Sequence, residues 1–334
     1  MSTLDGWDGW DGWDGWDGWD GWDGWDGWSS SPGARGGRAG ASGLALSTAR
    51  ELLVAGRPPA NMGRPPHWFR PEGADALTNV LPGVRRQVIC ADLLSRLLVV
   101  EETGKVKFLK VSGTGSKPAT LGAPMKPPAA AQFEAEVAQV EAHATLRNAR
   151  APEIIAQIKF NPAFWANVLP LNPRTTSNTL ELLLVSVAFT SHVCQRVKLM
   201  FNLPRPNEMS PRIQPIIATP GWSTYPSGHA TESFVIAALL DRLVRDGMPT
   251  STAKKKKVTA WIDSAKLGQM LVQLAERIAE NRVVAGIHFP VDTTGGKELS
   301  AILIAYLSER ASEAPAVDRT YAWLWNRAAA EWKA

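Results

Sequence analysis

The sequence has little cysteine and no long uninterrupted hydrophobic run. Cys90 and Cys194 are its only cysteines in 334 residues, which excludes a disulfide framework and a four-cysteine zinc site and permits a reducing compartment. The longest apolar stretches, near Leu182–Phe189 and Ala301–Leu307, are far shorter than the roughly 18–20 residues that span a bilayer. The first residues lack the basic and apolar regions of a secretory signal. We therefore expect a soluble, cytoplasmic protein without a membrane span.

Charge is distributed unevenly along the chain. Residues 5–28 are eight tandem copies of Asp-Gly-Trp, which contain eight of the 15 tryptophans and eight of the 32 acidic residues but no lysine or arginine. In the remainder, 36 basic residues face 24 acidic ones, a formal charge of about +12. A basic body favours anionic ligands. Since the four lysines at 254–257 accompany no nucleic-acid recognition motif, we predict no nucleic-acid partner.

The tripeptide repeat predicts an unfolded N-terminal tail. Its period is too short for a solenoid, and the absence of proline and the bulk of tryptophan exclude a collagen helix. The tail either has no folded role or uses its aromatic residues to bind a partner or itself. We predict three parts: a disordered tail with a Gly/Ser/Arg-rich linker (1–46), a proline-rich strap with a helix and hairpin packed on the core (47–128), and a helical domain (129–334).

Helical periodicity dominates from Ala129 onward. Apolar residues recur at helix-like spacing in the segments 130–150, 152–160, 179–201, 231–246, 253–280, 296–311 and 318–332. Upstream, we predict a helix at residues 84–98, a β-hairpin at 99–111 and a loop at 113–128. The short connections predict an all-α (mainly α) helical bundle with a small hairpin N-terminal to it.

Three short motifs carry side chains with useful chemistry. They are Lys198 with Arg205-Pro206, the sequence Pro226-Ser227-Gly228-His229, and Arg282 with His288 and Asp292. Arginine and lysine suit a tetrahedral oxyanion, and three buried cations need an anion. The Ser-Gly pair lies before a predicted helix, whose free N–H groups attract anions. One neutral imidazole can act as nucleophile or metal ligand, and a second can transfer protons.

In order and spacing, these motifs resemble the shared signature of the type 2 phosphatidic acid phosphatases and the vanadium-dependent haloperoxidases. That signature is Lys-x6-Arg-Pro, then Pro-Ser-Gly-His, then Ser-Arg-x5-His-x3-Asp. Here it reads KLMFNLPRP at 198–206, PSGH at 226–229 and NRVVAGIHFPVD at 281–292, with Asn281 where the family pattern usually has serine. The resemblance covers roughly residues 130–310 and implies a helical bundle that holds the anion between helices.

The resemblance also implies a role for each residue of the site. Phosphate or vanadate would be bound by Lys198, Arg205, Ser227, Gly228 and Arg282. His288 would be the catalytic nucleophile that forms a phosphohistidine, or the ligand of vanadium. His229 would be the catalytic acid–base, and Asp292 would orient His288 or hold the adjoining helix. Lys198 would also act catalytically, by hydrogen-bonding bound peroxide in a haloperoxidase.

Two activities share this signature, and three further features weigh between them. The absence of spanning helices disfavours the membrane lipid phosphatases, and the absence of an export signal counts modestly against the soluble acid phosphatases. The third feature is Trp222. It lies four residues before Pro226 and resembles the aromatic residue of soluble haloperoxidases, where it would line the halide side of the pocket; it could equally be a core residue. A haloperoxidase-like enzyme of the soluble branch, with vanadate as cofactor and peroxide and halide as substrates, is the leading prediction. The first alternative is a soluble acid phosphatase that cleaves a phosphate ester without a cofactor. The second is a non-enzymatic interaction protein that uses the Trp-rich tail.

Overall fold

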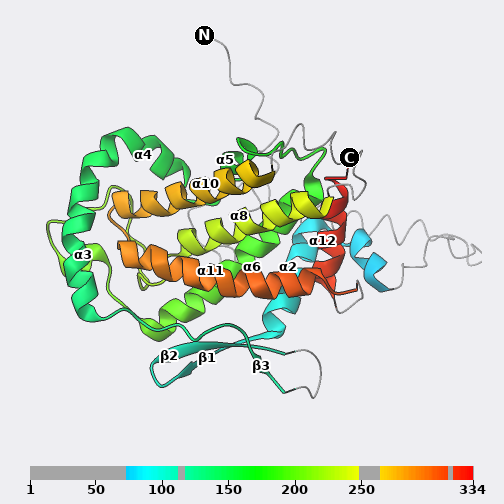
Figure 1. The fold of residues 1–334 in the computed structure, drawn as a ribbon, viewed down its shortest axis with the longest axis horizontal. Coiled ribbons are helices and arrows are strands. Elements are labelled where there is room, and N and C mark those ends of the chain that lie inside the picture. Colours follow the sequence, from blue (N-terminus) through cyan, green and yellow to red (C-terminus); the bar gives the residue numbers. More distant parts are fainter. Residues whose placement is uncertain (1–72, 112–116, 248–263, 315–318, 334) are drawn as a thin grey trace, which may run out of the picture. The chain divides into compact units, whose positions relative to one another are not determined.

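The computed structural model describes residues 73–111, 117–247, 264–314 and 319–333 (Figure 1). The Asp-Gly-Trp repeats, the proline-rich strap and the four lysines lie outside the described residues, as does the predicted boundary at 46. The described residues belong to one compact unit, Glu72–Ala334. The predicted boundary at 128 falls inside that unit and stays a prediction.

The structure is mainly α-helical with one small sheet, as the sequence predicts. The longer helices are α2 (Pro82–Ser95), α3 (Ala130–His143), α4 (Arg147–Ala156), α6 (Ser177–Phe201), α8 (Gly228–Gly247), α10 (Ser264–Val284), α11 (Pro290–Ala311) and α12 (Thr320–Ala330). The short helical segments are α5 (Ala163–Ala166), α7 (Pro206–Met209) and the 3-10 turns Gly73–Asn79 and Ala144–Leu146. Strands β1 (Leu97–Glu102), β2 (Lys105–Lys110) and β3 (Ala119–Thr120) form an antiparallel sheet in that order.

The predicted hairpin is present, with two differences around it. Thr103 and Gly104 connect its strands with positive φ angles of 53° and 72°, the conformation that two-residue hairpin turns require. Helix α2 ends at Ser95 rather than at 98, because Leu97 and Leu98 pair with β2. The short strand β3 lies within a segment that the sequence analysis predicted to be a loop.

The helix predicted at 130–150 is two helices. A 3-10 turn at Ala144–Leu146 separates α3 from α4. Helix α4 then continues through Pro152, so the separate helix predicted to begin there does not exist. Proline removes one hydrogen bond from a helix interior without always ending the helix. The single-sequence pattern could not show which outcome this proline would have.

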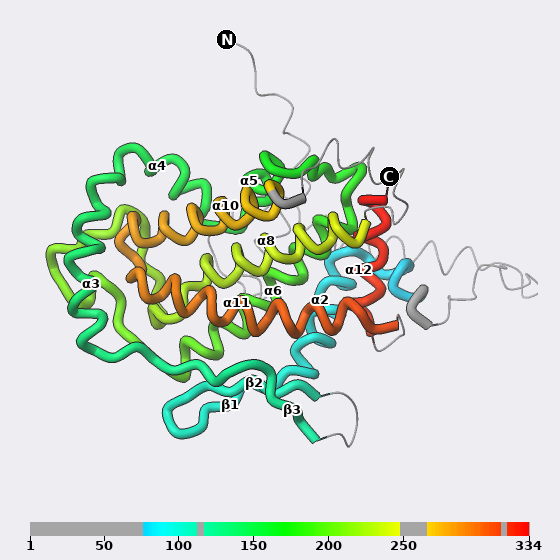
Figure 2. The backbone as a smooth tube through the Cα atoms, viewed as in Figure 1, coloured from blue at the N-terminus to red at the C-terminus, as the bar shows by residue number. Residues whose placement is uncertain are grey.

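Helix α8 lies at the centre of the bundle. It packs against α6, α10 and α11, and Figures 1 and 2 show α10 and α11 on either side of it with α6 behind. Its inner faces are aliphatic, with Val235, Leu239 and Leu243 fully buried. The start of α8 therefore has a neighbouring helix on several sides.

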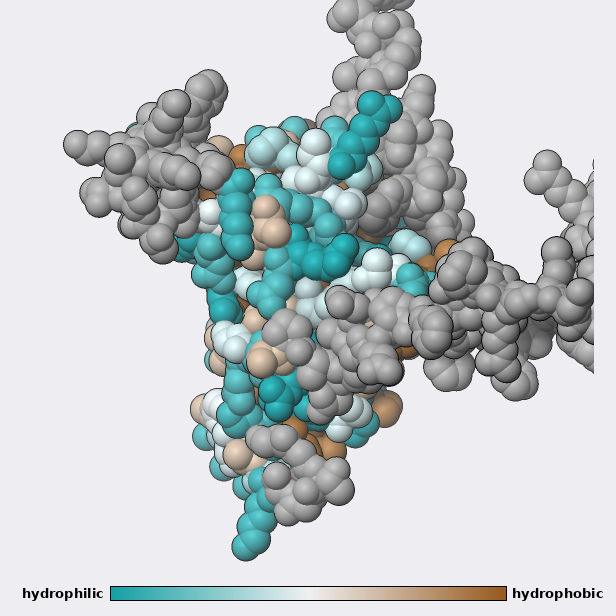
Figure 3. Space-filling view, turned by 90° about the vertical axis from the view of Figure 1, so that its right-hand side faces the viewer, coloured by the Kyte–Doolittle hydropathy of each residue, from teal (hydrophilic) through white to brown (hydrophobic). Residues whose placement is uncertain are grey.

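Helix α6 is the most apolar of these helices. Within the described residues, Ser177–Met209 is the one stretch whose length and composition would allow it to cross a membrane, and 72% of its most apolar window is buried inside the protein. A core helix passes the same test, so this is weak evidence for a span. On the face in Figure 3 the visible described residues are mostly hydrophilic. The cytoplasmic location stays a prediction.

Two consecutive glycines bring α11 close to the start of α8. A Cβ atom at Gly295 would overlap the ring of Tyr225, and one at Gly296 would lie 2.6 Å from the Cβ of Ala230 and 3.0 Å from the carbonyl oxygen of Ser227. Backbone atoms cannot move aside as a flexible side chain can. A larger residue at either position would therefore push α11 away from the turn that contains Ser227.

We predict that Gly296→Ala destabilises the protein although alanine is the better helix former. Alanine gains about 1 kcal/mol over glycine in a helix interior, whereas overpacking a tight contact costs about 1–3 kcal/mol. The expected net loss is therefore up to about 2 kcal/mol, measured as a lower urea midpoint. Gly221→Ala is the control, since no atom lies within 4 Å of its Cβ position. Equal midpoints for the two variants would contradict the packing argument.

Candidate active site

The three motifs meet at one end of the bundle. Helices α6 and α10 end there and α8 and α11 begin there, at the left in Figure 1. Lys198 lies in the last turn of α6 and Arg282 in the last turn of α10. The antiparallel course of the helices thus gathers motifs that are far apart in the sequence.

Asp292 connects the start of α11 to His288. Its Oδ2 atom accepts hydrogen bonds from the backbone N–H of Phe289 (2.9 Å), from Nδ1 of His288 (2.8 Å) and from the hydroxyl of Thr224. The first bond caps the helix, in the manner of an acidic residue in a first turn. The second orients the imidazole. The structure thus places Asp292 where it both holds α11 and orients His288.

Thr224 is a site residue that the sequence analysis missed. It is fully buried, and its hydroxyl lies 3.2 Å from Nδ1 of His288 as well as on the Asp292 carboxylate. Burial raises the pKa of Asp292 to about 6, and the hydrogen bond from Thr224 opposes that increase. No sequence signal distinguishes this threonine from others in the loop.

His288 is held as a neutral imidazole with one nitrogen available. Burial, followed by the charges of Lys198, Arg205 and Arg282, lowers its pKa well below the ordinary value. The carboxylate of Asp292 keeps the proton on Nδ1. Among the described residues Nε2 has no hydrogen-bond partner, so its lone pair is free to attack or to ligate.

Lys198 and Arg205 are buried and held by backbone carbonyls. The Nζ of Lys198 donates to the carbonyls of Ser223 and Thr224, each at 2.7 Å. Arg205 donates to the carbonyls of Trp222 (2.8 Å), Ser223 (3.3 Å) and Ile287 (2.8 Å). Burial, with a contribution from the charge of neighbouring Arg205, lowers the pKa of Lys198 to about 8. One N–H donor remains on the lysine and two on the arginine.

Arg282 is the most exceptional of the three cations. It is fully buried, and its Nη2 donates to the carbonyl of Ile154 (3.0 Å) and to Oε1 of Gln157 (3.2 Å). Its Nε and Nη1 have no partner among the described residues, and no acidic side chain there pairs with it. Burial lowers its pKa to about 10. Unpaired buried charge is costly, so this guanidinium needs an anion.

The Pro-Ser-Gly-His motif forms the start of α8. Ser227 caps the helix, with its Oγ 3.4 Å from the backbone N of Ala230, and its own N–H donates to the carbonyl of Asp292 at 2.9 Å. Gly228 is the first helical residue. The motif thereby adds a hydroxyl and helix-terminal N–H groups, which favour an anion.

His229 is also neutral, with the opposite ring nitrogen engaged. Its Nε2 lies 2.9 Å from the carbonyl oxygen of Gln157. Since a carbonyl only accepts, Nε2 has the proton and Nδ1 has the lone pair. Burial, and then the charge of Arg282, lowers the pKa of His229 to about 3. The charge of Arg282 thus disfavours the protonated form of both histidines.

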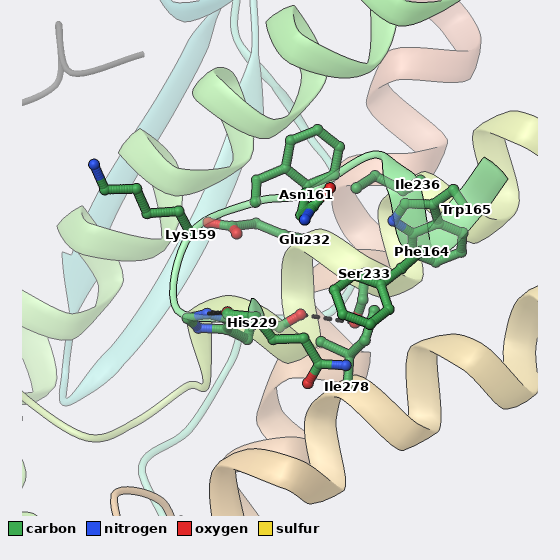
Figure 4. Close-up of a pocket in the computed structure, with 11 residues that line it drawn as sticks. Lys159, Asn161, Phe164, Trp165, His229, Glu232, Ser233, Ile236 and Ile278 are labelled. Carbon is green, nitrogen blue, oxygen red and sulfur yellow. Dashed lines mark hydrogen bonds between the residues drawn. The ribbon is translucent and has the colours of Figure 1, made fainter. Parts of the chain in front are cut away.

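Glu232, one turn after His229, is a second residue that the sequence analysis missed. Figure 4 shows both side chains lining a small cavity with Gln157, Trp165 and other residues of the α4–α5 region. The cavity volume is about 30 Å³, room for about one water molecule. Burial raises the pKa of Glu232 to about 8. At neutral pH this carboxyl is mostly protonated and adds little negative charge beside the anion site.

Trp222 lies at the edge of the site. Its carbonyl accepts a hydrogen bond from Arg205, while its side chain is 53% exposed. The interpretation of Trp222 as a core residue is therefore wrong. A role in lining the halide side of the pocket stays a prediction.

Residues 180–313 match the family model of the PAP2 superfamily, which agrees with the resemblance of the three motifs. The match includes every site residue that the sequence analysis predicted, from Lys198 to Asp292. No curated protein matches the chain. Proteins of the superfamily are generally enzymes, phosphatases or haloperoxidases, so the match supports chemistry at a phosphate-like anion.

We predict that Thr224→Val lowers kcat about tenfold, as loss of a positioning hydrogen bond commonly does. It also removes a donor that lowers the pKa of Asp292. Asp292 must be ionised to hold the Nδ1 proton of His288, so the acid limb of the pH–rate profile moves to higher pH. Thr224→Ser, which keeps the hydroxyl, is the control. An unchanged acid limb in Thr224→Val would refute this role.

Proposed function

We propose that the chain hydrolyses phosphate monoesters through a phosphohistidine at His288. The observation that carries this proposal is a fully buried Arg282 with unpartnered Nε and Nη1, close to a neutral histidine with an available Nε2. The first feature needs an oxyanion, and the second is a nucleophile directed at its central atom. All groups that the reaction requires are side chains of this chain.

In the first half-reaction, the N–H donors left on Lys198, Arg205 and Arg282 bind the phosphoryl oxygens. The Nε2 lone pair of His288 forms a bond to phosphorus as the bond from phosphorus to the ester oxygen breaks. Asp292, hydrogen-bonded to Nδ1–H, stabilises the positive charge that develops on the ring. The leaving oxygen receives a proton from Nδ1 of His229.

The acid role of His229 depends on the bound anion. In the free protein its pKa is about 3, so it has no proton to give at neutral pH. A bound phosphate compensates the charge of Arg282 and raises that pKa. In the second half-reaction, water attacks phosphorus, Nδ1 of His229 takes its proton, and the phosphorus–nitrogen bond breaks to release phosphate.

A vanadate-dependent haloperoxidase is the second candidate, because the unpartnered Nε and Nη1 of Arg282 suit vanadate as well as phosphate. The same residues fit vanadate, because it is a tetrahedral oxyanion for Arg282 and His288 offers a free Nε2. When bound, vanadate would supply the oxidation of halide by hydrogen peroxide. Among the described residues no cluster of His, Cys, Asp or Glu suits a bare metal ion, and an oxyanion requires none.

We place the phosphatase first for a reason that the sequence alone did not give. The haloperoxidase prediction depended in part on Trp222 in the pocket, and its ring does not line the cavity beside His229. The third alternative, an interaction protein that uses the Trp-rich tail, concerns residues outside the described part of the chain and stays a prediction.

We predict that purified protein hydrolyses p-nitrophenyl phosphate and that His288→Ala lowers kcat about 10³-fold or more. A quenched reaction with ³²P-labelled ester should leave acid-labile, base-stable label on the wild-type chain alone. If instead the protein brominates a 1,3-diketone with bromide, peroxide and orthovanadate, in a reaction lost in His288→Ala, and does not cleave the ester, the second candidate replaces the first.

We predict that the loss of activity in His229→Ala depends on the leaving group of the ester. The loss of a general acid typically costs about 10²–10⁴-fold, and this full loss is expected for an alkyl phosphate, whose alkoxide needs a proton. The loss should be much smaller for p-nitrophenyl phosphate, because p-nitrophenolate leaves without one. Equal losses for both esters would show that His229 does not protonate the leaving group.

A further inference from the structure

One residue outside the matched segment contacts two residues of the site. Gln157 directly follows α4 and is buried, with 3% of its surface exposed. The PAP2 match begins at residue 180, so the motif comparison gave Gln157 no role. It lies between the acid–base histidine and the buried arginine.

Every polar group of Gln157 is engaged. Its backbone carbonyl accepts from Nε2 of His229 (2.9 Å). Its side-chain Oε1 accepts from Nδ2 of Asn281 (2.9 Å) and from Nη2 of Arg282 (3.2 Å). Its Nε2 donates to Oε1 of Glu153 (3.1 Å), and its backbone N–H donates to the carbonyl of Glu153 (3.1 Å).

These bonds set the protonation and direction of the two site residues. The carbonyl bond keeps the proton of His229 on Nε2 and leaves Nδ1 for the reaction. The Oε1 bond, with the carbonyl of Ile154, occupies Nη2 of Arg282 and leaves Nε and Nη1 for the anion. A neutral amide is required there, because a carboxylate would pair with Arg282 and replace the anion.

Asn281 holds the side-chain oxygen of Gln157 in position. It stands where the family pattern usually has serine, and it is fully buried. Its Nδ2 holds Gln157 while its Oδ1 accepts from Nη1 of Arg150 (3.3 Å). A serine has a shorter side chain with one hydroxyl, so it would lose at least one of these two bonds. The departure from the pattern and Gln157 therefore form a matched pair.

We propose that Gln157, held by Asn281, is a positioning residue that couples the proton-transfer state of His229 to anion binding at Arg282. The proposal rests on the proposed function only in that both require an oxyanion at this site. Phosphate and vanadate are equivalent for it. The residue that follows α4 would thus contribute to the site, although it lies outside the segment that matches the family model.

The first test compares Gln157→Glu and Gln157→Met with wild type, using inorganic phosphate as the titrant in calorimetry. Gln157→Glu should weaken phosphate binding about tenfold or more, since the new carboxylate competes for Arg282. The same negative charge raises the pKa of His229, so the limb of the pH–rate profile that this group controls moves to higher pH. Gln157→Met should lower kcat/KM about tenfold. Gln139→Met, at an exposed position of α3, is the control and should behave as wild type.

The second test is Asn281→Ser, which restores the usual residue of the family pattern. We expect it to lower phosphate affinity and kcat/KM about tenfold rather than improve them. The double variant with Gln157→Met should be no worse than the worse single variant, because both changes remove the same contact. Wild-type behaviour of Asn281→Ser, or additive losses, would overturn the pairing.

The outcomes separate this proposal from the proposed function. If wild type binds phosphate and turns over while folded Gln157 variants keep its affinity and pH profile, the positioning role fails alone. If wild type binds neither phosphate nor vanadate, both fail. Thermal melts identify folded variants, and if Gln157→Met does not fold, the nearly isosteric Gln157→Glu still decides the outcome.

Discussion

The site depends on a buried positive charge without a carboxylate to balance it. Arg282 is enclosed by the bundle, and its hydrogen-bond acceptors within the described part of the chain are a backbone carbonyl and an amide oxygen. Lys198 and Arg205 nearby receive backbone carbonyls as well. Neutral acceptors orient cations without cancelling them, whereas a carboxylate partner would satisfy the charge permanently. Glu232 follows the same logic, because burial raises its pKa to about 8 and leaves it mostly protonated at neutral pH, so it adds little negative charge to compete with a ligand.

Helix direction supports this electrostatic arrangement. The cations Lys198 and Arg282 lie in the last turns of α6 and α10, where the helix dipole favours positive charge. The anion-facing groups lie at the opposite kind of terminus, with Ser227 and Gly228 at the start of α8. Close approach of α8 and α11, which the glycines of α11 allow, brings both kinds of helix end together. The fold therefore places two of the three cations at helix C-termini, beside the N-terminus of α8 that faces the candidate anion site.

Much of this arrangement could be predicted from the sequence. The motifs contain the residues that the structure gathers, and apolar periodicity located α6, α8 and α11 to within a few residues at most ends. Thr224 and Gln157 could not be found, because nothing in their local sequence differs from an ordinary loop residue. Gln157 lies 124 positions from its partner Asn281, so only the packing of α4 against α10 reveals the pair. The break between α3 and α4 was missed because alanine-rich sequence continues across it without a terminating signal.

The two histidines have different proposed roles at the same anion site, one as the nucleophile and one as the acid. Both have pKa values below the ordinary range in the free protein, so both begin as neutral imidazoles. For His288 this is the reactive form, and the Asp292 carboxylate prevents its proton from occupying the attacking nitrogen. For His229, in its proposed role as the acid, it is the inactive form, and an anion that compensates Arg282 would raise its pKa. Because Gln157 contacts both His229 and Arg282, the group that binds the anion and the group that transfers the proton share one rigid neighbour. Ligand binding thus prepares the acid at the moment when a leaving group is present to receive its proton.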